Sequence, residues 1–197
     1  PKNTPKGRKQ PHQKNIQWDE ISQGWIGPFI MSWFNSAIVR RTNALLNFKY
    51  GKDFIYDEVS VIPKKPFSKV KAQCYALGLG LFTGMLYFRF SRWLLSKTLL
   101  PKPGQGPSEK SRKSGFFIFD LIGAQSNNML KVTVSCGSDP GYSGTALMIG
   151  EAAVCLAIDE KLLPQNFGVL TPATAMGKTL INRLKKAGME FKYSNED

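Results

Sequence analysis

Histidine is almost absent from this sequence, and cysteine is scarce. His12 is the single histidine, and the three cysteines, Cys74, Cys136 and Cys155, form no C-x-x-C pair. Zinc sites are built mainly from these two residue types, so we predict no metal site. The odd cysteine count also argues against a disulfide framework and favours a reducing, intracellular compartment, in agreement with the lack of a visible secretory signal.

Acidic residues are also few. The 197 residues contain 14 Asp or Glu against 27 Lys or Arg, which gives a net charge of +13 and an isoelectric point near 9.8. Residues 1–14 carry five cations and no acid, and residues 64–113 carry eleven cations against the single Glu109. Such a bias suits an anionic lipid surface, nucleic acid or an acidic protein. We predict that residues 1–17 form a basic flexible arm.

Residues 136–188 lack an obvious acid, base or nucleophile but carry clear structural signals. Asp139-Pro140 predicts the start of a helix, because Asp is a favoured N-cap and proline fits the first helical position. Small and apolar residues then recur at helical spacing, and Pro164 prevents the helix from continuing. Small side chains on this helix would allow close packing by another element.

A second helix is predicted after a short extended piece at residues 168–172. Its apolar face carries Leu180, Ile181 and Leu184, and Gly188 is placed to end it. Together the two helices would cover one face of a sheet.

Charge is missing from Ala72 to Phe88, a run of 17 residues flanked on both sides by lysine and arginine. A helix that crosses a bilayer needs about 20 apolar residues, with about 17 as the lower limit. Ala76, Gly80 and Gly84 lie four residues apart and would form a stripe for close helix contact. We expect membrane contact here, as a spanning or an interfacial helix, with a helix buried in protein as the alternative.

The glycines of this run also resemble a dinucleotide-binding turn, at Gly78-x-Gly80 and Gly84. That turn requires a preceding strand, a following helix and an acidic residue about 20 positions later. Proline and lysine precede these glycines instead, and no acidic residue lies near position 100. We therefore predict no cofactor binding by this chain.

Alternating and apolar patterns predict four strands, at residues 54–62, 116–122, 129–134 and 189–193. Residues 126–128 form the expected hairpin turn. Pro28 is expected to open a further helix that ends near residues 46–47. The fold class is therefore α+β, with a mostly antiparallel sheet covered by helices and one apolar, membrane-associated helix.

This pattern divides the chain after its basic arm into three parts. Residues 18–66 would be the first part of the α+β domain, residues 67–100 an apolar helical insert, and residues 101–197 the second part of the same domain.

Several blocks of this sequence occur in the order seen in a known family. They are W-I-G-P-F-I-M at 25–31, V-R-R-T-N-A-L-L at 39–46, Y-G-K-D-F-I-Y-D-E at 50–58, P-K-P-G-Q-G-P-S-E at 101–109, G-S-D-P-G-Y-S-G-T-A at 137–146, G-V-L-T-P-A-T-A-M-G at 168–177 and L-I-N-R-L-K-K-A-G-M-E-F at 180–191. They resemble the C-terminal half of the saccharopine dehydrogenase-like oxidoreductases, a family that includes the trans-acting enoyl reductases.

The resemblance implies an NAD(P)-dependent oxidoreductase whose Rossmann half is absent from this chain. NAD(P) would then bind only a separate cofactor-binding half. The matched motif positions are expected to be structural, and no catalytic residue can be assigned. These positions are Asp139, Pro140, Gly141, Tyr142, Thr171 and Pro172. Tyr142 is expected in the core, with a ligand contact as the alternative.

Two functions remain open. In the first, the chain is the substrate-side domain of such an oxidoreductase and is not catalytic by itself. In the second, it is a membrane-anchored accessory subunit of an organellar complex, in a mitochondrion or plastid. The expected partners are a membrane or lipid surface and either partner subunits or the cofactor-binding half, with no nucleic acid.

Overall fold

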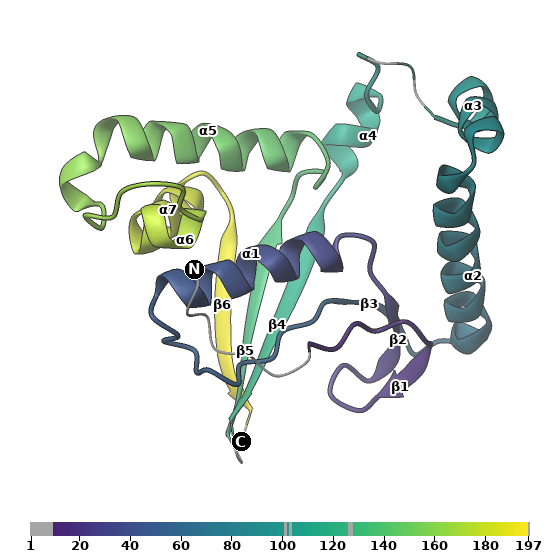
Figure 1. Cartoon of the computed structure of the whole chain (residues 1–197), viewed down its shortest axis with the longest axis horizontal. Coiled ribbons are helices and arrows are strands. Elements are labelled where there is room, and N and C mark those ends of the chain that lie inside the picture. The colour runs from purple at the N-terminus through teal and green to yellow at the C-terminus, as the bar shows by residue number, and fades with distance from the viewer. Residues whose placement is uncertain (1–9, 101, 103, 126–127, 197) are drawn as a thin grey trace. The chain divides into compact units, whose positions relative to one another are not determined.

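The computed structural model describes residues 10–100, 102, 104–125 and 128–196. The chain forms two compact units, Pro1–Lys102 (the N-terminal unit) and Pro103–Asp197 (the C-terminal unit). Each unit contains a three-stranded sheet, and every strand pair described is antiparallel. Helices accompany both sheets (Figure 1). The predicted α+β class with antiparallel sheets and helices is therefore confirmed, but as two sheets.

The N-terminal sheet has the order β1-β2-β3, with β1 at Gln17–Asp19, β2 at Gly24–Pro28 and β3 at Val59–Pro63. Trp18 pairs with Trp25 across β1 and β2, and their rings meet edge to face with centroids 5.7 Å apart. The strand predicted at 54–62 is shorter and lies in this sheet. Residues 54–58 instead form a loop whose side-chain hydrogen bonds are described below.

Helix α1 spans Ser32–Leu45, so the prediction that Pro28 opens this helix is wrong. Pro28 pairs with Val59 as the last residue of β2, a strand-end position that suits a residue without an N–H donor. The predicted end of the helix is close, because Asn47 and Phe48 have positive φ angles of 54° and 60°.

Helix α2 spans Ser68–Tyr87 and helix α3 spans Arg89–Thr98, separated by Phe88 in an extended conformation. The first half of α2 packs on the sheet. Ala72 is fully buried, the Tyr75 hydroxyl lies 3.0 Å from that of Ser60, and the Lys69 ammonium lies over the Trp25 ring at 5.4 Å.

No helix among the described residues is both long enough and apolar enough to cross a membrane, which corrects the spanning form predicted for residues 72–88. The physical reason lies in the composition of α2. It begins four residues earlier, at Ser68, so that Lys69 and Lys71 belong to it. Gln73, Thr83 and three glycines reduce its hydropathy further.

The C-terminal sheet has the order β4-β5-β6, with β4 at Phe117–Gln125, β5 at Asn128–Cys136 and β6 at Glu190–Glu196. These strands confirm the predictions at 116–122, 129–134 and 189–193 and extend each of them. Of the predicted hairpin turn, residues 126 and 127 lie outside the described residues, and Asn128 is the first residue of β5.

Helices α5 at Ser143–Ile158 and α7 at Gly177–Lys186 cover one face of this sheet. The other helical elements of the unit are α4 at Glu109–Ser114, the 3-10 turn η1 at Glu160–Leu162 and α6 at Pro172–Ala175. Helices α5 and α7 lie side by side (Figure 1). The core is formed by Cys136, Leu184 and Met189, with Phe117, Val134, Leu147, Met148, Leu180 and Phe191 packed around them.

Helix α7 ends as predicted at Gly188, which has a φ angle of +96°. The N–H of Gly188 donates to the carbonyl of Lys185 at 3.1 Å, and the N–H of Met189 donates to that of Leu184 at 2.9 Å. These two bonds form a Schellman motif, and the buried pair of Leu184 and Met189 supplies its hydrophobic contact.

Candidate functional site

Asp139 caps the start of α5, although the helix begins later than predicted. The carboxylate accepts hydrogen bonds from the N–H groups of Tyr142 at 2.9 Å and Ser143 at 2.8 Å. Pro140, Gly141 and Tyr142 form a turn, and the regular helix starts at Ser143. The hydrogen bond from the Ser143 backbone is the main cause of a lowered pKa at Asp139, against the opposing effect of burial.

The turn after Asp139 is closely packed by backbone. A side chain at Gly115 would place its Cβ 2.5 Å from the Asp139 Cβ, and one at Gly144 would lie 2.9 Å from the Asp139 carbonyl oxygen. These two glycines therefore allow the chain to pass close to the capping residue.

Tyr142 lies at the surface, which corrects its expected place in the core. Its side chain is 49% exposed, and its ring lies 3.1 Å from where a Cβ on Gly106 would be. Thr171 and Pro172 begin α6. The Thr174 hydroxyl accepts from the Thr171 N–H at 3.0 Å, and Pro172 occupies the first turn.

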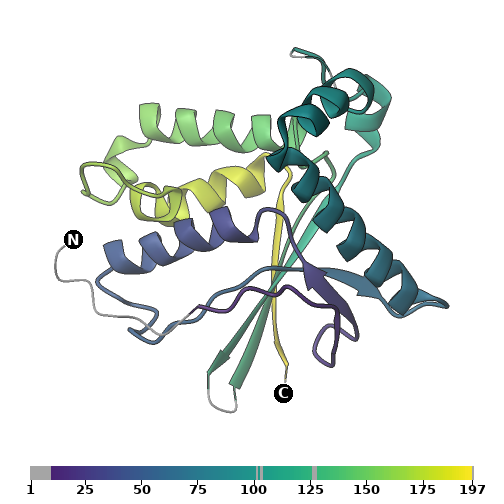
Figure 2. The ribbon, with the colours of Figure 1, turned by 45° about the vertical axis from the view of Figure 1, so that its right-hand side comes forward.

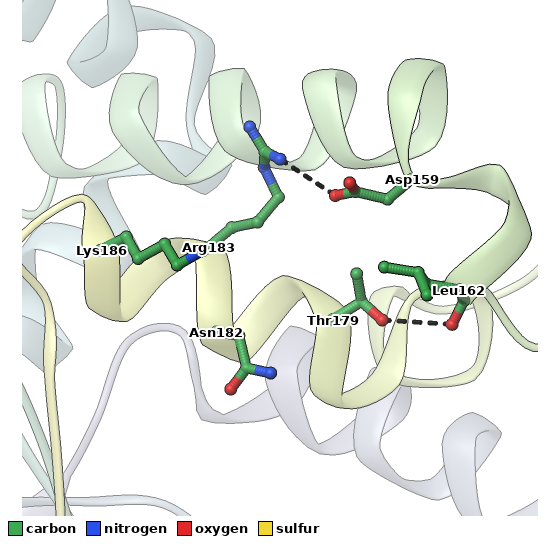
Figure 3. Close-up of a pocket in the computed structure, with 6 residues that line it drawn as sticks. All are labelled: Asp159, Leu162, Thr179, Asn182, Arg183 and Lys186. Carbon is green, nitrogen blue, oxygen red and sulfur yellow. Dashed lines mark hydrogen bonds and ion pairs between the residues drawn. The ribbon is translucent and has the colours of Figure 1, made fainter.

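A polar pocket of about 360 Å³ lies in the C-terminal unit, where α5, η1 and α7 meet (Figure 3). Its lining consists of Asp159, Leu162, Thr179, Asn182, Arg183 and Lys186. The wall between η1 and α7 is held by the Thr179 hydroxyl, which donates to the Leu162 carbonyl at 3.2 Å.

Arg183 joins α7 to α5 beside this pocket. Its Nε donates to Glu151 at 2.8 Å, and its Nη1 donates to Asp159 at 3.0 Å. The guanidinium points toward Asp159 in Figure 3, whereas the Asn182 amide points to the other side of α7. The hydrogen bond to Asp159 is the main cause of a raised pKa at Arg183, so this cation is fixed between two carboxylates.

The nearby Cys155 is not an activated nucleophile. The side chain is fully buried, and burial raises the pKa of its thiol, with a further contribution from Asp159. The pocket thus offers a lysine and an ion-paired arginine, which can bind a polar group. It contains neither histidine nor a free thiolate for acid–base or nucleophilic chemistry.

A second polar cluster organises the N-terminal unit around Asp57. Its carboxylate accepts from the Gln13 N–H at 2.7 Å, the Ser32 hydroxyl at 2.8 Å and the Glu58 N–H at 2.9 Å. The His12 Nδ1 lies 3.7 Å away. The described part of the predicted basic arm, residues 10–16, is therefore attached to the loop before β3, while residues 1–9 lie outside the described residues.

Glu58 is the buried member of this cluster, with 7% of its surface exposed. It accepts from the Asn35 amide at 2.7 Å and from the Tyr56 hydroxyl at 2.8 Å. Burial is the main cause of a raised pKa at Tyr56, and the hydrogen bond to Glu58 adds to it. The neutral, donating form of this tyrosine is thus favoured, and the cluster ties α1 to the loop at 54–58.

The predicted small-residue stripe of α2 is open at its two glycines. A Cβ built on Gly80 or Gly84 meets nothing within 4 Å, whereas Ala76 is half-buried. The helix contact predicted for this stripe therefore stays a prediction.

These residues also do not fit a nicotinamide cofactor. The glycines lie inside α2, whereas pyrophosphate binding requires backbone N–H groups at the start of a helix that follows a strand. All described strands pair antiparallel, so no βαβ unit is formed by them. The described residues also include no cluster of three or more His, Cys, Asp or Glu that could hold a metal ion.

Sequence reasoning missed both polar clusters. Arg183, Asp57 and Glu58 lie in the blocks quoted above and Asp159 lies between two of them, but their partners are distant in sequence. Arg183 meets Glu151 across 32 positions, and Asp57 meets Gln13 across 44. A local pattern could have marked the charged residues but not these pairings.

Comparisons with known proteins give a consistent group of relatives. The chain is 34% identical over 176 residues to the trans-acting enoyl reductase of Mycobacterium tuberculosis, and 33% identical over 172 residues to that of Mycobacterium ulcerans. Each match covers 86% of this chain and 41% of the relative. A further M. tuberculosis protein, named only provisionally as a trans-acting enoyl reductase, is 35% identical over 178 residues, 87% of this chain and 42% of that protein.

No family model and no solved structure matches the chain. None of these three relatives is named a saccharopine dehydrogenase. Of the predicted resemblance, the comparisons therefore support the part that concerns the trans-acting enoyl reductases. The chain spans about two fifths of the length of the curated relatives it matches, and over most of its own length it is similar to proteins named trans-acting enoyl reductases.

Proposed function

We propose that this chain forms the substrate-side part of an enoyl reductase and does not catalyse the reaction by itself. The observation that carries the proposal is the extent of the similarity. Identity of 33–35% covers 86–87% of this chain but only 41–42% of each relative. The remaining part of such an enzyme would supply the cofactor site.

The chemistry of the described residues supports this division. Reduction of an enoyl group needs a hydride donor, which a cofactor supplies. Neither the glycines of α2 nor the antiparallel sheets of this chain fit a nicotinamide. The polar pocket beside α7 has groups that can position a substrate, but Arg183 is held by two carboxylates and Cys155 is buried. Binding and positioning are therefore the roles these residues can perform.

A chimera tests the proposal. The 176 matched residues of the M. tuberculosis enzyme would be replaced by the corresponding part of this chain, and NADPH oxidation that depends on an enoyl thioester would be measured. We expect activity to be retained, because the replaced part is similar throughout. NADPH binding and cooperative melting of the chimera serve as the folding controls. A chimera that binds NADPH and melts cooperatively but does not reduce the substrate would contradict the proposal.

The isolated chain gives the complementary test. Titration with NADPH, followed by the fluorescence of the nucleotide, should show no saturable binding at micromolar concentrations. The full-length M. tuberculosis enzyme is the positive control. Micromolar binding by the chain alone would show that it contains a cofactor site and would refute the division into two parts.

The alternative function, a membrane-anchored accessory subunit of an organellar complex, is not proposed. No observation on the described residues or on the similar proteins favours it over the enzyme part.

A further inference from the structure

The longest stretch of this sequence without an acidic residue runs from residue 59 to residue 108. It carries eight Lys or Arg and contains α2 and α3. Two of its lysines are used within the N-terminal unit, where Lys64 lies over the Trp18 ring at 5.8 Å and Lys69 over the Trp25 ring at 5.4 Å. The later cations lie around residues 86–100, which we call the α2–α3 tip.

The α2–α3 tip lies at a distance from the sheet of the N-terminal unit. The first half of α2 is fixed there by the buried Ala72 and by the contact between Tyr75 and Ser60. The second half is open on the face of Gly80 and Gly84, because a Cβ on either would meet nothing within 4 Å. Both views place α3 at the end of α2 that is distant from β1, β2 and β3 (Figures 1 and 2).

Large apolar side chains are exposed on the tip. They are Tyr87 (82% exposed), Phe88 (70%), Phe90 (73%), Trp93 (55%) and Leu99 (68%). Arg89, Arg92 and Lys97 lie among them in sequence, and their side chains are also exposed. Soluble surfaces rarely expose a group of this kind without a partner. The charge of the tip requires that partner to be anionic.

The serine and threonine hydroxyls of the tip are used within the helices. Ser91 donates to the carbonyls of Met85 and Phe88, Ser96 donates to that of Trp93 and Thr98 to that of Leu94. These donors are thus used inside the helices. What remains outside is aromatic, with the tyrosine hydroxyl of Tyr87 included, or aliphatic or cationic, and side chains of these kinds occupy the interface of a bilayer.

We propose that the α2–α3 tip binds the surface of an anionic lipid bilayer. The aromatic side chains enter the headgroup region, and the three cations contact lipid phosphates. Leu95 of α3 is buried, and no helix among the described residues is long and apolar enough to cross a membrane, so we place the tip on the membrane surface. The enoyl reductase proposal is independent of this one.

Vesicle sedimentation of the full chain tests the charge requirement. Vesicles of phosphatidylcholine with about one third phosphatidylglycerol should bind the chain, and binding should weaken as salt rises. Pure phosphatidylcholine vesicles should bind far less. The triple variant Arg89→Glu, Arg92→Glu, Lys97→Glu should lose affinity by at least a hundredfold, since each cation near such a surface contributes about a factor of five.

A matched variant controls for net charge. Lys52→Glu, Lys161→Glu and Lys178→Glu make the same change at exposed positions outside the tip and should leave binding within about threefold of wild type. Thermal melting of both variants must be cooperative. Equal losses in the two variants would overturn the proposal, as would equal binding to neutral and anionic vesicles.

Brominated lipids test insertion of the aromatic residues. They should quench the tryptophan fluorescence of the bound chain, and Trp93→Phe should remove most of this quenching. Trp33→Phe, at a similarly exposed tryptophan of α1, should not. Unchanged quenching in Trp93→Phe would overturn the proposal. Binding of duplex DNA at equal affinity, lost in the same tip variant, would assign the tip to nucleic acid instead.

Discussion

The N-terminal unit carries 17 Lys or Arg against 5 Asp or Glu, whereas the C-terminal unit carries 10 against 9. In the C-terminal unit, carboxylates hold several of the cations. Arg183 bridges Glu151 and Asp159, Lys131 meets Asp120 at 3.2 Å, and Lys192 meets Glu190 at 2.7 Å. The ion pairs of Arg183 and Lys131 join neighbouring elements, whereas that of Lys192 lies within β6.

The N-terminal unit uses charge in the opposite way. Asp57 and Glu58, two of its few acids, accept hydrogen bonds from neutral donors of Gln13, Ser32 and Asn35. Among the cations of α2 and α3, Lys69 lies over the Trp25 ring, and Arg89, Arg92 and Lys97 lie at the exposed tip. The net charge of +13 thus comes mostly from the N-terminal unit, where it is available for a partner. The other unit uses its charges for its own stability.

The largest effect that separates the two units is expected from Leu184→Ala. Leu184 is 7% exposed and belongs to the core of the C-terminal unit, so its loss should cost about 2–5 kcal/mol of unfolding free energy. Urea unfolding, followed by hydrogen exchange of amides in each unit, measures this. Protection should fall in α7 and β6 and stay unchanged in β1, β2 and β3.

Leu162→Ala is the matched control, since Leu162 is 70% exposed in η1. It should change the unfolding free energy by no more than about 0.5 kcal/mol. Equal loss of protection in both units after Leu184→Ala would show that the two units unfold together and would remove the basis of the comparison.

Glu58→Ala is expected to lower the stability of the N-terminal unit, by less than Leu184→Ala lowers that of the C-terminal unit. The change leaves the Asn35 amide and the Tyr56 hydroxyl without their acceptor, at a cost of about 1–3 kcal/mol. Protection should fall in α1 and β3 and not in β5. Glu20→Ala, at an exposed position of the same unit, is the control. A decrease confined to the C-terminal unit would contradict this assignment.

Local signals predicted the C-terminal unit well. The alternating runs that became β4 and β5 pair across a short hairpin, and Gly188 ends α7 because its position needs a positive φ angle. Each of these depends on residues near in sequence. The same holds for Asp139, whose carboxylate caps N–H groups three and four residues ahead, although the regular helix starts later.

The features that were not predicted depend on distant partners. The strand near residue 60, β3, belongs to the N-terminal sheet because it pairs with β2, which lies more than 30 residues earlier in the sequence. Pro28 looked like a helix start because its role as the last residue of β2 is visible only from that pairing. The pocket is similar, because Arg183 selects Glu151 and Asp159 only after α5 and α7 have packed.

The smallest effect is expected from Asp139, and it depends on pH. The pKa of Asp139 is lowered in the folded protein, mainly by the hydrogen bond from the Ser143 backbone. A lowered folded-state pKa means that the stabilisation is present above the ordinary Asp pKa of 3.8 and is lost as the pH falls below it. Asp139→Ala should therefore lower the Tm of the C-terminal unit by a few °C at neutral pH, as for other N-caps.

The difference in Tm between wild type and Asp139→Ala should then shrink as the pH falls below 3.8, because protonation weakens the cap in the wild type alone. Asp120 and Glu190 also have lowered pKa values in this unit, but both are present in each protein, so their effects cancel in the difference. Asp139→Asn keeps an oxygen acceptor without the charge, and its Tm difference from Asp139→Ala should not vary over this range. A wild-type advantage that persists unchanged at low pH would mean that the carboxylate charge contributes nothing to the cap, and that the C-terminal unit does not depend on this charge to start α5.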